Sequence, residues 1–166
     1  IDASIPDAAE VIMNDRKETA EHYTIVDLIR NDLNMVSKNV RVERFRYIET
    51  IATHESRLLQ VSSEITGVLD SDFNSHLGDI FCDLLPAGSV SGAPKKKTME
   101  IILDTEGYKR GYYTGIFGLF DGKNVDSGVM IRFIEKNENG LYYKSGGGIT
   151  SFSDPESEYL EMIGKI

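Results

Sequence analysis

The sequence predicts an α+β domain in which antiparallel strands are covered by helices on one side. Apolar residues recur at helical spacing near the start of the chain and again in three later segments. Between these segments lie short runs that alternate between apolar and polar residues and are joined by short turns. Short turns favour antiparallel pairing, because a parallel pair of strands needs a long crossover.

The composition is that of an ordinary globular protein. Of 166 residues, 40% are hydrophobic and 27% are charged, and no apolar run has the length of a membrane span or the pattern of a signal peptide. Cys82 is the only cysteine, which excludes an internal disulfide and fits a reducing cytoplasm. The net charge of −9 argues against nucleic acid or an acidic membrane as a partner, and an anionic substrate would need local cations.

The first predicted element is a long helix that runs from Pro6 to about Val36. Glu21 shares a helical face with the apolar Ile25 and Leu28, where an unpaired carboxylate would be costly. Two interpretations stay open. Glu21 is either a partly exposed carboxylate that pairs with a neighbour such as Lys17, or a buried metal ligand or acid.

Two strands and a helix are predicted next. Residues 40–51 and 58–69 are strand candidates, and residues 53–56 form the turn between them. His54 in this turn is expected at the surface. Residues 72–85 have a helical pattern with one apolar side.

A loop with two glycines and two serine hydroxyls precedes the next helix, which is predicted to start at Pro94 and to end after Glu106 at Gly107. Hydroxyls and free amide groups at a helix start favour an anion. Three consecutive lysines, 95–97, oppose the helix dipole there. They are either a solvated charge run or held in place for a purpose other than helix stability.

The third group of strands comprises residues 116–120, 125–135 and 141–145, with turns at residues 121–124 and 137–140. Within the second strand, Arg132 is expected among apolar neighbours, and a buried guanidinium needs a carboxylate partner. That partner is either part of a structural salt bridge or the carboxylate of a substrate.

Three glycines, 146–148, follow the last strand and let the backbone approach a ligand closely. Ser153 and Glu156 have the spacing of a capping box, and Pro155 suits the first turn of the helix that they predict. The sequence therefore predicts a glycine loop that leads directly into the N-terminus of a helix.

On this last helix Glu158, Glu161 and Lys165 share one face. A separate apolar stripe is expected to dock the helix on a core: Tyr159, Ile163 and Ile166. The glycine loop, helix start and aligned carboxylates together predict a metal-assisted anion site. The alternative is that Glu161 and Lys165 form a solvated pair worth ~0.3–0.5 kcal/mol.

Five segments in one order cover nearly the whole chain: Lys17–His22 continuing into Ile25–Leu33, Pro86–Lys95, Arg110–Gly115, Ile131–Arg132, and Gly146–Ile149 with Glu158, Glu161 and Lys165. Together they resemble the chorismate-utilising enzymes, which include the large components of aminodeoxychorismate synthase (para-aminobenzoate synthase) and anthranilate synthase, and the isochorismate and salicylate synthases. The resemblance implies that residues 1–166 are the C-terminal portion of a chorismate-binding catalytic domain. The chain begins without methionine and stops inside a helical pattern, so we also expect it to be part of a longer protein.

The resemblance implies a Mg²⁺ site formed by Glu21, Glu158 and Glu161. Carboxylates that converge in one pocket repel each other unless a divalent cation neutralises them, and Mg²⁺ prefers oxygen ligands and keeps positions open for substrate oxygens. Such an ion would also let a protein of net charge −9 bind the chorismate dianion.

The resemblance also implies the residues that contact chorismate. Lys165 and the amides of Gly146 and Gly147 would bind the ring carboxylate, Arg132 and Tyr113 would bind the enolpyruvyl carboxylate, and Ser89 would line the ring. Gln60 stands where relatives commonly have a substrate-facing histidine. It can donate and accept hydrogen bonds, but it cannot act as a cation or an acid.

The activity implied is Mg²⁺-dependent amination of chorismate to 4-amino-4-deoxychorismate, on the route to p-aminobenzoate and folate, with ammonia from a glutamine amidotransferase. Ser89 favours this branch, since anthranilate synthases usually have threonine there. In this branch a lysine in a Pro-Ile-Lys-Gly-Thr segment adds to the ring. The segment is absent from this chain, so no catalytic residue is assigned and the chain alone is expected to be inactive. The alternatives are anthranilate synthase component I and, because of Gln60, a non-catalytic chorismate-binding domain.

Overall fold

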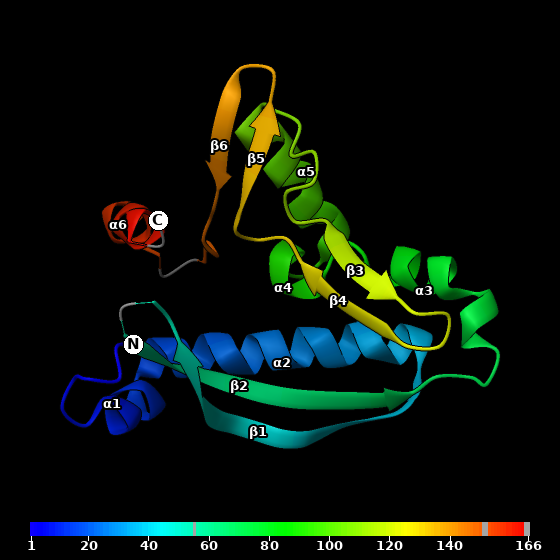
Figure 1. Ribbon diagram of the computed structural model, residues 1–166, viewed down its shortest axis with the longest axis horizontal. Helices are drawn as coiled ribbons and strands as arrows, with labels where there is room; N and C mark the ends of the chain where they lie inside the picture. Colours follow the sequence, from blue (N-terminus) through cyan, green and yellow to red (C-terminus); the bar gives the residue numbers. More distant parts are fainter. Residues whose placement is uncertain (55, 151–152, 165–166) are drawn as a thin grey trace. The chain divides into compact units, whose positions relative to one another are not determined.

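The computed structural model describes residues 1–54, 56–150 and 153–164. The chain divides into two compact units, unit 1 (Ile1–Leu84) and unit 2 (Leu85–Ile166). Each unit combines helices with antiparallel hairpins (Figure 1), which confirms the predicted α+β class. None of the described helices is both long enough and apolar enough to cross a membrane.

Unit 1 contains a long helix that lies along a two-stranded hairpin (Figure 1). Its elements are α1 (Ala8–Asn14), α2 (Arg16–Val36), β1 (Lys38–Ala52), β2 (Arg57–Val68), the 3₁₀ turn η1 (Phe73–Ser75) and α3 (Leu77–Leu84). Ala8 and Val26 are the two buried hydrophobic residues among those described. The α2 helix contacts both strands and α3, so it organises this unit.

The prediction of one helix from Pro6 to Val36 is wrong at Asp15. This residue has an extended backbone (φ −62°, ψ 122°) and separates α1 from α2. Its carboxylate accepts a hydrogen bond of 2.8 Å from the amide of Glu18. An aspartate that satisfies an amide of the next turn favours a helix start over helix continuation. The predicted helix 72–85 is likewise shorter, because α3 begins only at Leu77 after the η1 turn.

The β1–β2 hairpin confirms the two predicted strands and the turn between them. The strands pair antiparallel, and the amide of Thr53 donates to the carbonyl of Ser56 at 2.9 Å to close the turn. Register shifts occur between Val42 and Arg44 and between Arg44 and Tyr47. A bulge adds a residue to one strand, so it changes which residues face the core. This explains why the alternation of apolar and polar residues along β1 shifts by one position after Val42.

The described residues of unit 2 form two separate hairpins and three helices (Figure 1). Its elements are α4 (Gly88–Ser91), α5 (Lys95–Glu106), β3 (Ile116–Phe120), β4 (Val125–Val129), β5 (Phe133–Asn137), β6 (Gly140–Lys144) and α6 (Pro155–Ile163). The predicted ends of α5 are confirmed: Pro94 is the N-cap, and Gly107 ends the helix in the left-handed conformation with φ 66°.

The prediction of one strand over residues 125–135 is wrong. Strands β4 and β5 are separate, and β4 pairs with β3 whereas β5 pairs with β6. At the break, the amide of Thr114 donates to the carbonyl of Met130 at 2.8 Å, and the amide of Met130 donates to the carbonyl of Gly115 at 2.9 Å. Met130 thus pairs with the turn before β3. The chain then leaves one hairpin and starts the next, which places Arg132 outside both strands.

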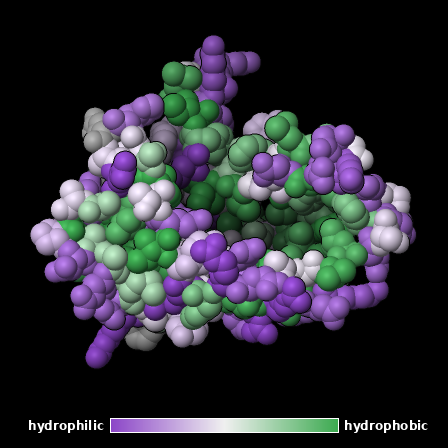
Figure 2. All heavy atoms as spheres, turned by 60° about the horizontal axis from the view of Figure 1, so that its bottom comes forward, coloured by the Kyte–Doolittle hydropathy of each residue, from purple (hydrophilic) through white to green (hydrophobic). Residues whose placement is uncertain are grey.

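Many large hydrophobic side chains of both units are exposed. Leu119 and Phe117 on β3 are 79% and 62% exposed, and Leu141 on β6 is 70% exposed. Figure 2 shows such hydrophobic residues, in green, over much of the face in view. The described residues therefore supply only part of the cover that these strands need.

Candidate functional site

The start of α6 sets the position of the acidic residues on this helix. Asp154 is the N-cap, and its carboxylate accepts from the amide of Ser157 at 3.0 Å and from the hydroxyl of Ser157 at 2.8 Å. These hydrogen bonds lower the pKa of Asp154. The predicted capping box of Ser153 and Glu156 is wrong, because the Ser153 hydroxyl instead accepts from the amide of Thr150 at 3.0 Å. Pro155 occupies the first turn as predicted.

Glu158, one turn into α6, is buried against the glycine loop. Its residue exposure is 9%, and a Cβ atom added to Gly147 would lie 3.5 Å from the carboxylate oxygen Oε2 of Glu158. Both residues line a hollow of about 430 Å³ together with Tyr159. The structure thus brings together two of the residues that the sequence predicted for one site.

The other predictions for α6 have mixed outcomes. Glu161 is exposed, unlike Glu158. Tyr159 and Ile163 are 58% and 44% exposed, so the prediction that an apolar stripe docks this helix on a core is wrong for these two residues. The described residues provide no surface that covers the stripe. Lys165 and Ile166 lie outside the described residues, and the predicted role of Lys165 remains a prediction.

Tyr113 approaches the glycine loop from the turn that precedes β3. A Cβ atom added to Gly146 would lie well inside 3.0 Å of the Tyr113 hydroxyl oxygen, closer than real Cβ atoms approach. Any larger residue at position 146 would therefore force this phenol to move. Burial raises the pKa of Tyr113, while the nearby charge of Arg110 opposes the rise. The phenol consequently stays protonated and available as a hydrogen-bond donor at neutral pH.

Tyr113, Gly146, Gly147 and Glu158 form a contiguous group, which we call the glycine-loop site. It offers a phenol O–H, backbone amides and a buried carboxylate. The first two suit the oxygen atoms of an anionic ligand, whereas the carboxylate suits a cation or a hydrogen-bond donor. A cation that bridges the carboxylate and an anionic ligand would use both halves of the site.

Arg132 differs from what the sequence predicted of its surroundings, whereas the predicted role of Ser89 in lining the ring remains a prediction. Ser89 lies on the short α4 helix and is exposed. Arg132 is also exposed, and the prediction that it is buried among apolar neighbours is wrong because it lies outside the strands. Ser91, the second serine hydroxyl of this loop, is 1% exposed, and its hydroxyl donates to the carbonyls of Ala87 and Gly92 at 3.2 Å. Ser91 is a structural residue of this loop.

Glu21 and Gln60 belong to unit 1. The side chain of Glu21 is 40% exposed, and its Oε1 lies 3.8 Å from Nζ of Lys17, which is the ion pair that the sequence left open. Gln60 is exposed and donates to the hydroxyl of Ser62 at 3.1 Å. Among the described residues no three acidic, histidine or cysteine side chains are grouped closely enough to hold a metal ion. The predicted Mg²⁺ site draws on both units and remains a prediction.

A polar cluster next to Glu21 was not predicted. Nε2 of His22 lies 2.7 Å from the hydroxyl oxygen of Ser63, which also accepts from the amide of Arg46 at 3.0 Å. The guanidinium of Arg46 donates to the carbonyl of Met13 at 3.0 Å. Burial and the charge of Arg46 lower the pKa of His22. The cluster ties α2 to the hairpin one residue away from Glu21.

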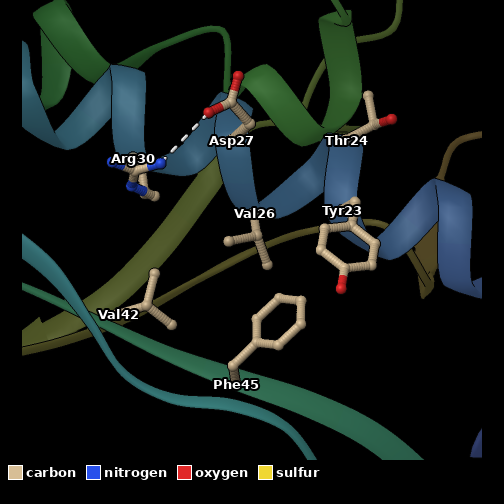
Figure 3. A pocket seen from close by; sticks show the side chains of 7 residues that line it. All are labelled: Tyr23, Thr24, Val26, Asp27, Arg30, Val42 and Phe45. Carbon is tan, nitrogen blue, oxygen red and sulfur yellow. Dashed lines mark hydrogen bonds and ion pairs between the residues drawn. The ribbon is translucent and has the colours of Figure 1, made fainter.

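Unit 1 also has a hollow of about 730 Å³ between α2 and β1 (Figure 3). The rings of Tyr23 and Phe45 form one wall, with centroids 4.9 Å apart, and an ion pair of 3.5 Å joins Arg30 to Asp27. Tyr23 and Phe45 are 57% and 41% exposed. This hollow is open and largely apolar.

The fold and the glycine-loop site together define a class: an α+β protein that groups a glycine loop, a phenol and a buried carboxylate. The sequence profile of the chorismate binding enzymes matches residues 6–166. The chain belongs to this family.

Relatives with similar sequences support this family membership. An uncharacterised PabA-like protein of Haemophilus influenzae is 52% identical over 166 residues, which are 100% of this chain and 51% of that protein. Anthranilate synthase component 1 of Aquifex aeolicus is 38% identical over 160 residues, which are 94% of this chain and 31% of that protein. The chain therefore spans between about a third and about half of the length of these relatives.

Two solved structures have a similar fold. Anthranilate synthase component I from Streptococcus pneumoniae TIGR4 matches with a TM-score of 0.80 and 34% identity, over 96% of this chain and 36% of that one. A 2,3-dihydroxybenzoate-specific isochorismate synthase from Bacillus anthracis, described as putative, matches with a TM-score of 0.76 and 26% identity, over 95% of this chain and 41% of that one.

Proposed function

We propose that this chain is the C-terminal portion of a Mg²⁺-dependent enzyme that aminates chorismate to 4-amino-4-deoxychorismate. The observation that carries the proposal is the glycine-loop site, in which Glu158 is buried against Gly147 and the Tyr113 hydroxyl lies against Gly146. The Glu158 carboxylate offers oxygen ligands to a cation and the amides of the glycine loop offer donors to an anion, so the site suits a ligand that carries both. Membership in the chorismate binding enzyme family supports chorismate as that anion.

The residues present fit Mg²⁺ in their chemistry. Glu158 and Glu161 are carboxylates one turn apart on α6, and Glu21 would complete the set. All three offer the oxygen ligands that Mg²⁺ prefers. When bound, the ion supplies positive charge that polarises and orients the substrate carboxylate.

The remaining residues bind and orient the substrate. The Tyr113 hydroxyl donates a hydrogen bond to a carboxylate oxygen, which its raised pKa permits over the whole neutral range. The amides of Gly146 and Gly147 donate to the ring carboxylate with Lys165. Arg132, whose guanidinium is exposed, offers a fork for the enolpyruvyl carboxylate, and Ser89 lines the ring.

Ammonia comes from a glutamine amidotransferase partner, and the lysine that adds to the ring lies in a segment outside this chain. Ser89 favours the aminodeoxychorismate branch, which leads to p-aminobenzoate and folate. Anthranilate synthase is the second candidate, because the Aquifex relative and the Streptococcus structure both bear that name. The two activities differ in their products, which makes them separable in one assay.

The test uses the full-length protein that contains residues 1–166, incubated with chorismate, MgCl₂ and ammonium at pH 8. Mass spectrometry then distinguishes 4-amino-4-deoxychorismate from anthranilate plus pyruvate. The first product supports the proposal and the second supports the alternative. Equilibrium binding of chorismate without either product would identify a non-catalytic binding domain, and absence of Mg²⁺-dependent chorismate binding would refute all three.

A further inference from the structure

An ion pair outside the predicted site braces the turn that carries Tyr113. Arg110 donates from Nε to Oε2 of Glu106 at 2.7 Å and from Nη2 to Oε1 at 2.5 Å. The two side chains are 20% and 26% exposed. A two-pronged, mostly buried contact of this kind is much more directional than a surface ion pair. Glu106 accordingly raises the pKa of Arg110.

This pair is not an ordinary contact within a helix. Helix α5 ends at Glu106, and Gly107 then turns the chain in the left-handed conformation. Arg110 therefore belongs to the following loop and reaches back to the last residue of the helix. The pair fixes the start of the loop against α5, which is a rigid element.

Arg110 makes two further contacts, both with the turn itself. Its Nη1 donates to the hydroxyl of Thr114 at 3.2 Å, and its guanidinium carbon lies 5.4 Å from the centroid of the Tyr113 ring, within range of a cation–π interaction. Thr114 has φ 65°, an uncommon conformation for a β-branched residue that its surroundings must hold in place. Its hydroxyl in turn donates to the carbonyl of Tyr113 at 2.6 Å.

The Tyr113 ring is consequently held between two partners. Arg110 lies beside the ring, whereas the hydroxyl at the far end of the ring lies against Gly146. We propose that Arg110, braced by Glu106, is the positioning residue that holds the Tyr113 hydroxyl at the glycine-loop site. The effect of Arg110 on chorismate binding rests on the proposed function, whereas its effect on the position of the Tyr113 ring does not.

The decisive comparison is between Arg110→Met and Lys109→Met in the full-length protein. The first removes the fork and the charge, and the second removes a neighbouring exposed cation. For Arg110→Met we expect KM for chorismate to rise by about tenfold to a hundredfold, the range that misplacing a binding group by about 1 Å produces. Lys109→Met should leave KM within about twofold of the parent, the scatter of an ordinary surface substitution.

A second measurement follows the ring without any substrate. Ring-labelled tyrosine is titrated by NMR, and the Tyr113 signal is assigned by its loss in Tyr113→Phe. Burial is the largest cause of the raised pKa of Tyr113, so a ring released by Arg110→Met should titrate closer to the ordinary tyrosine value of about 10. If the ring stays in place, removal of the Arg110 charge can only raise the pKa further. An unchanged or higher pKa in Arg110→Met therefore overturns the proposal.

Two more variants separate positioning from stability. The exchange of Glu106→Arg with Arg110→Glu keeps an ion pair but places no cation beside Tyr113, so it should restore the melting temperature without restoring KM or the phenol titration. Full restoration of all three would mean that the pair is only structural. If Arg110→Met fails to fold, the milder Glu106→Gln takes its place with KM as the readout, because loss of the Glu106 charge by itself lowers the pKa of Tyr113. If the parent does not bind chorismate, the proposed function fails, and the phenol titration alone still decides the role of Arg110.

Discussion

Replacing Gly146 by alanine is the sharpest perturbation that the glycine-loop site allows. The added Cβ would lie well inside 3.0 Å of the Tyr113 hydroxyl oxygen, whereas ordinary contact begins at 3.4 Å. The hydroxyl must therefore retreat by about 1 Å. Because the obstacle is the end of a side chain and not backbone, the ring yields, at a cost of about 0.5–1.5 kcal/mol for strained side-chain torsions.

The expected result is a large loss of activity with a small loss of stability. A displacement of about 1 Å at a binding group costs on the order of 100-fold in rate, while about 1 kcal/mol lowers the melting temperature by about 2–4 °C in a chain of this size. The assay is kcat/KM for chorismate in the full-length protein, with differential scanning calorimetry on the same samples.

Gly148 provides the matched control, because a Cβ atom added there meets nothing within 4 Å. Gly148→Ala should leave both quantities near the parent values. The double variant Gly146→Ala with Tyr113→Phe removes the clashing oxygen, so it should regain stability relative to Gly146→Ala without regaining activity. If Gly146→Ala and Gly148→Ala behave alike, the contact between Tyr113 and Gly146 does not form the site and the reasoning fails.

Three further predictions test separate parts of the molecule. Burial lowers the pKa of His22, so the folded state favours the neutral imidazole. The stability that this preference contributes is fully present above the unfolded pKa of about 6.5 and is lost as pH falls through the lower pKa of the folded state. Urea unfolding at pH 7.5 and 5.5 should therefore show a decrease in stability that His22→Gln reduces. Gly118→Ala should destabilise the β3–β4 hairpin by about 1–3 kcal/mol, because its Cβ would lie 2.5 Å from the backbone carbonyl oxygen of Asp126; an unchanged urea midpoint would contradict this. Isothermal titration with Mg²⁺ in the presence of chorismate should show a greater loss of affinity for Glu158→Gln than for Glu161→Gln, since only Glu158 is buried, and equal losses would count against the proposed ligand set.

Local signals predicted most of the helices and strands. The hairpin turn before Val125, Pro94 at the start of α5 and Gly107 at its end were all confirmed. In each case the decisive interaction joins residues only a few positions apart, such as the amide of Asn124 and the carboxylate of Asp121 at 2.6 Å. Turn and cap chemistry of this kind is legible in a single sequence.

The wrong predictions fall where two local structures compete for the same residues, or where the chain changes from one strand partner to another. Asp15 interrupts a helical pattern because its side chain caps the next helix, and Asp154 replaces Ser153 as the cap of α6 for the same reason. At Met130 the apolar alternation continues through a point where the chain leaves one hairpin. Periodicity records which face a residue occupies, but it does not record which strand lies beside it.

By itself the sequence determined the α+β class, the family, and the glycine loop that leads into an acidic helix, because these depend on residue type and short spacing. Only the tertiary structure decided that Tyr113 reaches Gly146, that Glu158 is buried against Gly147 and that Arg110 braces the turn. The Tyr113 and Glu158 contacts join residues more than ten positions apart, whereas Arg110 and Glu106 lie four positions apart on opposite sides of a helix end. In all three cases side-chain direction and close packing in three dimensions set the contact, and neither is encoded in periodicity or composition.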